Sequence, residues 1–501
     1  MGSDASGSIE PSVFKPALIL TAGRTLGFVA SFAMPIVLVR VFSQGEFGTY
    51  KQLFLIYATL YSIGQCGMAE SLFYFLPGNP PRAGGFILNS VLGLALSGGA
   101  CLALLILVAR PLGIFFHNRA LERDAPLIGI FLLLMLIAAT LEIVMTVKNR
   151  HGLAFFSYAF SDVVRAALCI GPALLADGVH GLLLGAIAFA ALRCATTLGY
   201  LYSQYRHELR LDMRQLRAQL GYALPFAAAV LIDVAQNNLH FYAVSSYFNA
   251  ATYAVYAVGC LQVPLVDHLM TMTCNVMMVR MREHQGQAAA LAIWRDATRK
   301  LAMMFAPLVV LLLVVSHRLI ITLFTARYAR SVPIFRVWSI SLLLPALLTD
   351  GALRVYAQNR YLMLVNAAKL AVVACLVVWF LRMFGLVGAV LATLLAALIG
   401  KAMAMVRIRR LLRCSVRQLL PWRSLAGIAV VAAAAALPAL ALQSTLRWPG
   451  LPLLAATTWM YVLAYVAALY GFGPLTRQER CALLGWARTP AVRLLRDWRS
   501  S

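Results

Sequence analysis

The polar side chains with the most regular spacing lie inside a long apolar stretch at residues 221–248. Asp233, Gln236, Asn237 and His240 occur at positions i, i+3, i+4 and i+7, so a helix places them along one side. A carboxylate, two amides and an imidazole at membrane depth are costly unless they face other helices or water. The pattern therefore predicts either a hydrated transport cavity or a set of hydrogen bonds that join neighbouring helices.

Helices that can position these side chains are predicted along the whole chain. The 501 residues are 62% hydrophobic and only 12% charged, with a mean hydropathy of +0.81, which excludes an ordinary soluble domain. The fold class is an all-α polytopic membrane protein with about fourteen transmembrane helices. The apolar runs lie near residues 16–39, 52–76, 84–109, 125–147, 152–176, 179–202, 221–246, 251–277, 301–324, 333–356, 361–381, 385–406, 424–445 and 450–473.

The formal net charge of +25 has a membrane explanation. Basic residues concentrate in alternate loops, whereas the intervening loops hold few. The positive-inside rule then places both termini of this multi-pass protein in the cytoplasm. Nucleic-acid binding is not indicated, because these residues are divided among separate loops and accompany no binding motif. Examples on the basic side are Lys148, Arg210, Arg295, Lys300, Arg409 and Arg423, with Arg119 and Arg327 opposite.

Further ionisable residues fall within the first half of the chain or near span ends. Arg24 in the first span either snorkels to the interface or points into a cavity. Glu70 lies in the second span. Asp162 and Arg165 in the fifth are spaced i, i+3 and can neutralise each other, which is a common way to tolerate buried charge. Lys401, near the end of the twelfth span, is expected to snorkel.

The second half carries a comparable set. In the eighth span Pro264 precedes Asp267, and a proline break beside an ionisable group suits a helix that bends next to a cavity. Asp350 and Arg354 at i, i+4 form a candidate ion pair at the end of the tenth span. Lys369 lies inside the eleventh span, about one turn from the expected interface, so snorkelling explains it less readily.

No enzymatic or metal motif accompanies these residues. The nine cysteines are scattered, without a CxxC pair or a Cys/His cluster, so no disulfide, metal site or cofactor is predicted. A P-loop, a GxSxG elbow and an HExxH motif are also missing from the sequence, which indicates that the chain is not an enzyme and does not itself use ATP. A polytopic glycan polymerase, ligase or glycosyltransferase is a weaker alternative, because the external loops are short.

Three neighbouring segments resemble a known family. Arg24-Thr25-Leu26-Gly27-Phe28, Leu38-Val39-Arg40-Val41-Phe42-Ser43 and Glu46-Phe47-Gly48-Thr49-Tyr50 together resemble the first helical hairpin of Wzx-type flippases for O-antigen and exopolysaccharide. These belong to the multidrug/oligosaccharidyl-lipid/polysaccharide exporter superfamily. The first of these segments is also similar to the opening of the lipid II flippases.

An internal echo fits this resemblance. Tyr253-Ala254-Val255-Tyr256 follows Phe47-Gly48-Thr49-Tyr50 at an offset of 206 residues, as expected for a duplicated six-helix unit, although interfacial tyrosines can also match by chance. We therefore expect two pseudo-symmetric lobes, at 1–202 and 221–406, joined by a cytoplasmic linker at 203–220. Two appended helices at 407–473 and a basic cytoplasmic tail at 474–501 complete the prediction.

The resemblance implies a flippase that moves a polyprenyl-diphosphate-linked oligosaccharide outward by alternating access, with Na⁺ or H⁺ as candidate coupling ions. Membrane lipids and other glycan assembly proteins are the further expected partners. The closest alternative is a drug/cation antiporter of the same superfamily. In the flippase, the cations of Arg24, Arg165, Arg354 and Lys369 would contact the diphosphate or acidic sugars. Sugar hydroxyls or the coupling cation would bind Asp233, Gln236, Asn237 and His240, and Glu70 and Asp267 are further cation candidates.

Overall fold

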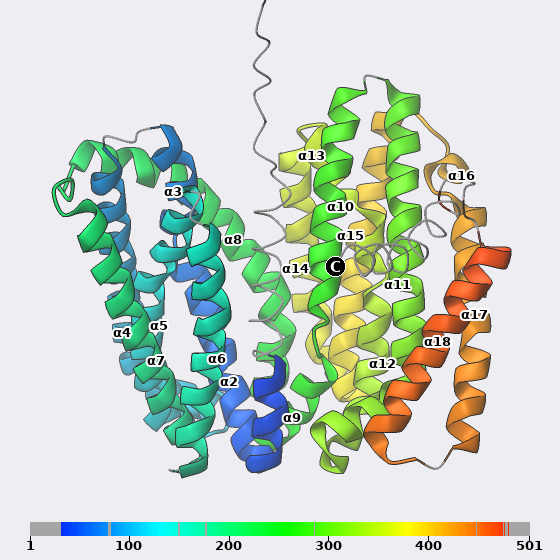
Figure 1. Ribbon diagram of the computed structural model, residues 1–501, viewed down its shortest axis with the longest axis horizontal. Helices are drawn as coiled ribbons and strands as arrows, with labels where there is room; N and C mark the ends of the chain where they lie inside the picture. Colours follow the sequence, from blue (N-terminus) through cyan, green and yellow to red (C-terminus); the bar gives the residue numbers. More distant parts are fainter. Residues whose placement is uncertain are drawn as a thin grey trace, which may run out of the picture. The chain divides into compact units, whose positions relative to one another are not determined.

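The computed structural model describes residues 32–78, 82–148, 151–175, 178–284, 286–446, 448–473, 475 and 479. Over these residues the regular structure consists of helices, without strands (Figure 1). The chain divides into two compact units, Met1–Ala257 and Val258–Ser501, which we describe separately as unit 1 and unit 2.

Unit 1 begins, within the described residues, with a short apolar helix at Phe32–Val41. The elements that follow are α2 (Gln44–Gly64), α3 (Met68–Gly78), α4 (Ala83–Phe115), α5 (Ala120–Val147), α6 (His151–Leu175), α7 (Gly178–Tyr205) and α8 (Met213–Tyr247). Helix α9 (Ala250–Gly259) spans the division between the two units. Helices α4, α5 and α7 pack side by side, and α8 packs against α2, α3 and α4.

Unit 2 contains the remaining elements of the described chain. They are α10 (Pro264–Glu283), α11 (Gln287–Phe324), η2 (Ala326–Ser331), α12 (Val332–Ser341), η3 (Leu344–Leu347), α13 (Thr349–Val355), α14 (Asn359–Phe384), α15 (Leu386–Leu412), α16 (Val416–Leu419), α17 (Trp422–Thr445) and α18 (Gly450–Phe472). Helix α11 is the longest at 38 residues, and α17 and α18 pack against it.

The predicted membrane spans coincide with these helices, which confirms the all-α polytopic fold. Ten helical segments of the described chain are long and apolar enough to cross a bilayer. The first predicted span enters the described residues only at Phe32. The predicted lobe linker at 203–220 is partly helical, because α7 continues to Tyr205 and α8 begins at Met213. Only the residues between these two helices form an irregular connection.

Three predicted spans are interrupted by local backbone geometry. Between α2 and α3, Cys66 and Gly67 adopt positive φ angles of 46° and 68°, which a regular helix does not allow. The eighth span breaks after α9, and Pro264 opens α10 at a position where its missing N–H costs nothing. The tenth span, predicted at 333–356, divides into α12, η3 and α13, with Leu348 left-handed at φ 47°.

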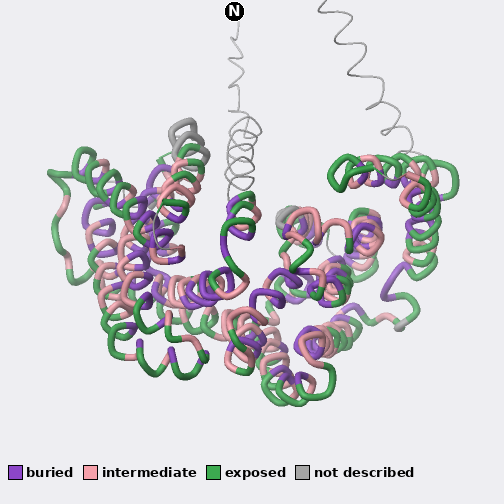
Figure 2. The backbone as a smooth tube through the Cα atoms, turned by 90° about the horizontal axis from the view of Figure 1, so that it is seen from below, coloured by how far each residue is buried: buried purple, intermediate pink, exposed green. Residues whose placement is uncertain are grey.

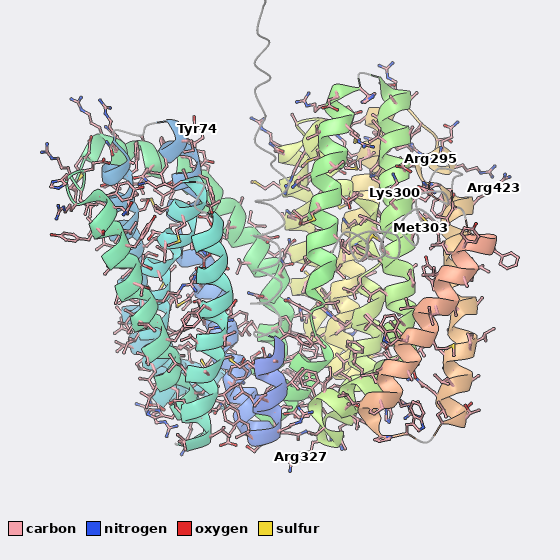
Figure 3. The ribbon with its side chains drawn as sticks, in the orientation of Figure 1. Tyr74, Arg295, Lys300, Met303, Arg327 and Arg423 are labelled. Carbon is pink, nitrogen blue, oxygen red and sulfur yellow. The ribbon has the colours of Figure 1, made fainter. Side chains whose placement is uncertain are left out.

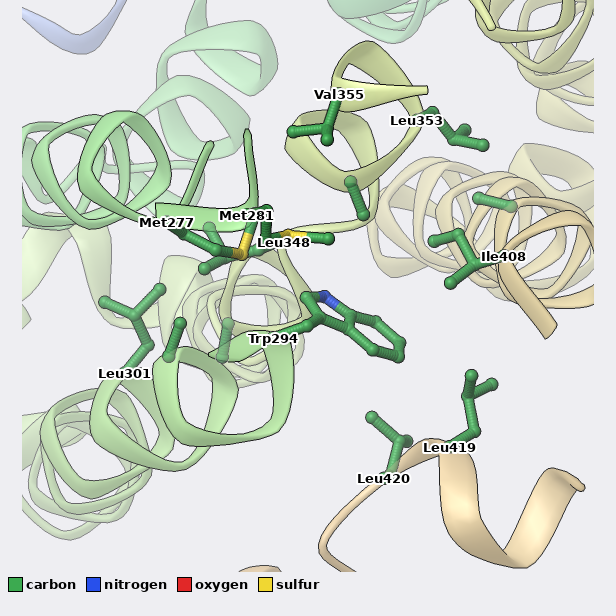
Figure 4. Packing of buried hydrophobic residues seen from close by; sticks show 14 of the residues in the cluster. Met277, Met281, Trp294, Leu301, Leu348, Leu353, Val355, Ile408, Leu419 and Leu420 are labelled. Atoms are coloured by element: carbon green, nitrogen blue, oxygen red, sulfur yellow. The ribbon is translucent and has the colours of Figure 1, made fainter. Parts of the chain in front are cut away.

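Apolar side chains hold each unit together, and Figure 2 shows the buried positions on helix faces that turn toward their neighbours. In unit 2, the fully buried ring of Trp294 lies among Met281, Leu301 and Ile408 (Figure 4). Its Nε1 donates to the carbonyl of Leu347 over 2.9 Å, so burying the indole leaves no polar group unsatisfied. Close van der Waals packing of such side chains and interhelical hydrogen bonds stabilise helix contacts in a membrane protein.

The predicted internal echo has a counterpart in the helix starts. Ser43 caps α2 by accepting the N–H of Glu46, and Asn249, 206 positions later, caps α9 by accepting the N–H of Thr252. The two starts touch within unit 1, because a Cβ placed on Gly48 would overlap the backbone carbonyl of Ala250. Glycine is therefore required at position 48 for this close approach.

Charged side chains mark the ends of unit 2. Arg295 and Lys300 lie at one end of the unit and Arg327 at the other (Figure 3). The sequence assigned these residues to opposite sides of the membrane, and the arrangement agrees with that separation. Which end faces the cytoplasm stays a prediction.

Candidate functional site

The polar stripe of α8 is divided by its surroundings. Asp233 and Asn237 are exposed, whereas Gln236 and His240 are buried, at 6% and 1% exposure. The Nε2 group of Gln236 donates to Asp233 Oδ1 over 2.9 Å, so the amide orients the carboxylate. An exposed carboxylate this far along a membrane helix needs a hydrated surface rather than lipid. Asp233 and Asn237 are therefore the exposed members of the stripe, and their contact with a substrate stays a prediction.

His240 has a packing role. Its Nδ1 lies 2.6 Å from the hydroxyl of Tyr256, which is also fully buried and belongs to the α9 part of unit 1. The ring of Phe241 contacts both of them. A buried imidazole that shares a hydrogen bond with a buried phenol fixes α9 to α8. The buried His240 thus fits the interpretation of hydrogen bonds that join helices, whereas a transport cavity beside the exposed pair stays a prediction.

A second polar face of α8 escaped the sequence reasoning. Asn238 and Tyr242 both donate to the hydroxyl of Thr59 in α2, over 3.0 and 2.9 Å. Ser245 lies one turn after Tyr242 and two turns after Asn238, and its hydroxyl accepts a hydrogen bond from Gln52 of α2 over 2.9 Å. Their spacing of i, i+4 and i+7 was a detectable signal, obscured because it interleaves with the first stripe. This face joins α8 to α2.

Charged residues from three helices gather inside unit 1. The guanidinium of Arg193 in α7 pairs with Glu142 of α5 and donates to the hydroxyl of Ser161 in α6 over 2.6 Å. The predicted pairing of Asp162 with Arg165 is confirmed at 2.8 Å. Two carboxylates thus meet two guanidinium groups, so these two ion pairs are balanced in charge.

A pocket opens beside this cluster. Its volume is about 230 Å³, and its wall combines Glu142 and Arg193 with Tyr61 and Gln65 from the break between α2 and α3. The neighbouring Glu70, in the first turn of α3, has a buried carboxylate oxygen Oε2 without a hydrogen-bond partner among the described residues. A buried acceptor of this kind is suited to a proton or a cation.

Unit 2 carries an excess of positive charge around α13 to α15. Lys401 donates to Thr349 over 2.9 Å and lies 3.6 Å from the carboxylate of Asp350. The predicted pair between Asp350 and Arg354 is wrong: in the described chain, Asp350 turns toward α15 instead, and Arg354 is exposed. Lys401 consequently binds within the unit rather than only snorkelling. The Asp350 carboxylate, in the first turn of the seven-residue α13, thus pairs with a side chain of the neighbouring α15.

Lys369 also lies across a helix contact. Its Nζ donates to Asn366 over 3.3 Å, and its stem crosses Gly400 of α15, where an added Cβ would lie 2.5 Å from Lys369 Cδ. Together Arg354, Lys369 and Lys401 place three cations on α13 to α15. Such groups are appropriate for a phosphate or an acidic sugar.

The remaining sequence candidates lie apart from these groups. Asp267 is exposed in the first turn of α10. Arg24 lies outside the described residues. Within the described part of the chain, three or more His, Cys, Asp or Glu side chains do not converge as metal ligands would.

Comparison with known proteins identifies the family. The sequence profile of the polysaccharide biosynthesis protein family matches residues 37–333, which is more than half of the chain. The chain belongs to this family. The matched region contains α2 to α11. It therefore includes the α8 stripe, Glu70 and the cluster around Arg193. A search of curated proteins found no match.

Solved structures share the fold of this family member at low sequence identity. The lipid II flippase MurJ in an inward closed conformation has a TM-score of 0.63 and 14% identity, and the match covers 89% of this chain and 98% of that one. An outward-facing multidrug resistance MATE family transporter of the MOP superfamily has a TM-score of 0.55 and 12% identity, with coverage of 80% and 96%. The Vibrio cholerae MATE transporter VcmN, in its bent form, has a TM-score of 0.53 and 13% identity, with coverage of 80% and 97%.

Proposed function

We propose that this member of the polysaccharide biosynthesis family is a flippase for a polyprenyl-diphosphate-linked oligosaccharide, such as an O-antigen or exopolysaccharide repeat unit. The observation that carries the proposal is family membership in a chain with the fold of lipid II flippase MurJ. Sugars and diphosphates cannot cross hydrocarbon without replacement solvation. Polar and charged side chains of a membrane protein can supply the hydrogen bonds that water no longer provides.

The described side chains suit the chemistry of such a cargo. Asp233 and Asn237 on α8 offer an acceptor and an amide that can bind sugar hydroxyls. Arg354, Lys369 and Lys401 in unit 2 offer cations for the diphosphate or for acidic sugars. The lipid anchor stays in the bilayer while these groups bind the polar part.

The transport cycle that we propose takes place in a bacterial inner membrane, with both termini in the cytoplasm and Na⁺ or H⁺ as the coupling ion. Asp233, Glu70 and Asp267 are the candidate sites for that ion. Of these, Glu70 has the strongest support, because one of its carboxylate oxygens is buried without a partner in the described chain. Rocking of two lobes about the site would give alternating access.

Depletion of the protein in its native cell tests the proposal. We expect a diphosphate-linked oligosaccharide to accumulate and to stay inaccessible to a glycan-modifying enzyme added outside spheroplasts. The MATE-like fold also fits a drug/cation antiporter. Sensitivity to cationic drugs without any accumulated glycan would favour that antiporter and contradict the flippase.

Two substitutions address the site directly. Asp233→Asn and Arg24→Ala are each expected to abolish glycan export while the protein still inserts, because each removes a charge proposed to contact cargo or ion. Glu283→Gln is the matched control, since it removes an exposed carboxylate at the end of α10. Normal export in either test variant would remove that residue from the site, and loss of export in the control would show a general effect of charge.

A further inference from the structure

A second polar pocket lies at one end of unit 1, far from the α8 stripe along the helices. It has a volume of about 600 Å³ and forms where the first turn of α4, the connection from α7 to α8 and the first turns of α8 meet. Three arginines from these segments line it, namely Arg82, Arg210 and Arg214, and all three are exposed. None of them belongs to the groups described above.

Charge and hydrogen bonding both indicate an anionic ligand. The pocket sets three arginines against Glu208 and Asp212, an excess of one positive charge. Asp212 is already engaged, because its carboxylate caps α8 by accepting the N–H groups of Arg214 and Gln215 over 2.8 and 3.3 Å. A single phosphodiester anion would neutralise the excess, and arginine is the preferred donor to phosphate.

The wall also contains an unsatisfied amide. Gln215 lines the pocket, and its Oε1 atom is buried without a partner in the described chain, pressed against Gly85. An amide carries two donors as well as an acceptor, so Gln215 can turn its NH₂ group to a phosphate oxygen or keep its oxygen for a hydroxyl. The site thus combines guanidinium donors with an amide whose oxygen lacks a partner in the described chain.

Aromatic residues fix the depth of this pocket in the membrane. Phe86, which lines it, stacks on Phe75 at 4.9 Å between ring centroids. Tyr74 and Tyr222 stack on each other at 5.0 Å, and they are 64% and 44% exposed. Figure 3 shows Tyr74 near the end of α3 in unit 1. Tyr74 lies near the end of α3, and Tyr222 lies at the start of the predicted span at 221–246. Exposed tyrosines at the ends of membrane spans favour the headgroup level of a bilayer, which indicates that the pocket opens at that level.

We propose that this pocket binds the phosphate group of a membrane lipid. The lipid tails would lie along the apolar flank of unit 1 beside the tyrosines, and the phosphate would bind Arg82, Arg210 and Arg214. The phosphate can come from a bulk phospholipid or from a polyprenyl-diphosphate lipid, and both present the same chemistry. Because the pocket includes the first turns of α8, occupancy would steady the helix that carries Asp233 and Asn237.

Binding can be measured on the purified full-length protein in a neutral detergent, without any transport. The probes are dioctanoyl-phosphatidylglycerol, a short polyprenyl diphosphate and inorganic phosphate, with native mass spectrometry and thermal shift as readouts. We expect the two lipids to compete for one site. Each should bind at least tenfold more tightly than inorganic phosphate. The stronger competitor identifies the source of the phosphate.

Three variants separate a built site from general surface attraction. The triple variant Arg82→Gln/Arg210→Gln/Arg214→Gln should weaken lipid binding at least tenfold, since each basic residue near a membrane contributes about 1 kcal/mol, or about fivefold. Arg409→Gln/Arg410→Gln/Arg413→Gln removes the same charge from exposed positions of unit 2 and should leave binding unchanged. Ala218→Phe keeps the charge but fills the pocket, and it should also weaken binding.

Several results would overturn the inference. Equal losses in the two triple variants would reduce the effect to net charge. Binding of inorganic phosphate as tight as that of the lipids would exclude a lipid site, and undiminished binding in the Arg82 triple variant or in Ala218→Phe would exclude the pocket. Because glycan export is not measured here, these failures would leave the proposed flippase function untouched.

Discussion

Replacing Gly48 by alanine is expected to force apart the starts of α2 and α9. The added Cβ would overlap the carbonyl oxygen and carbon of Ala250 and lie 3.1 Å from its Cα. These are backbone atoms, so no side-chain rotation can relieve the overlap, and one helix start has to move. Overpacking of this kind costs about 1–3 kcal/mol.

A matched control exists in the same unit. Gly99 in α4 has no atom within 4 Å of the position that a Cβ would take. Alanine there should be neutral or stabilising by about 0.5–1 kcal/mol, because it lowers the entropy cost of a helical glycine. The two variants therefore differ in the expected sign of the change, although they add the same methyl group.

Thermal unfolding of the purified protein measures the difference. At about 2–4 °C per kcal/mol for a domain of roughly 150–250 residues, which is close to the size of unit 1 (Met1–Ala257), Gly48→Ala should lower the midpoint by roughly 2–12 °C, whereas Gly99→Ala should leave it unchanged or raise it. If Gly48→Ala unfolds at the same temperature as Gly99→Ala, the two helix starts are not in backbone contact, and the requirement for glycine at position 48 is refuted.

Variants at three further contacts can be tested by thermal unfolding and glycan export. Arg193→Gln leaves the carboxylate of Glu142 unpaired and should cost about 3–5 kcal/mol, and adding Glu142→Gln should recover part of that loss; strict additivity would contradict the ion pair. Tyr256→Phe removes the partner of His240 and should destabilise by about 1 kcal/mol without abolishing export, so an unchanged midpoint would speak against that hydrogen bond. Lys401→Met should reduce export more than stability, whereas Lys401→Arg should retain most export; equal export by both would exclude a need for positive charge.

The sequence was sufficient for the membrane helices, because hydropathy and length report directly on the solvent that a segment must meet. It also predicted the contact between Asp162 and Arg165, which lie one turn apart on one helix. The interruptions around Gly67 and before Pro264 had visible signals in glycine and proline.

The rest of the site depended on neighbours that no local pattern specifies. Arg193 finds Glu142 from 51 positions away, and Asp350 selects Lys401 on another helix over Arg354 one turn along its own. Spacing correctly assigned the α8 stripe to one side of the helix. It could not separate the buried His240 from the exposed Asp233, since burial is decided by the elements packed against α8.

The two capped helix starts bear on how such a chain can arise. Under the predicted duplication, Ser43 and Asn249 cap equivalent starts, and the even number of predicted spans between them would let both copies enter the bilayer from the same side. The meeting of Gly48 with Ala250 agrees with that shared side. A half-length ancestor would then have needed only one insertion orientation, and gene fusion would have joined two like-oriented copies without reversing the topology of either.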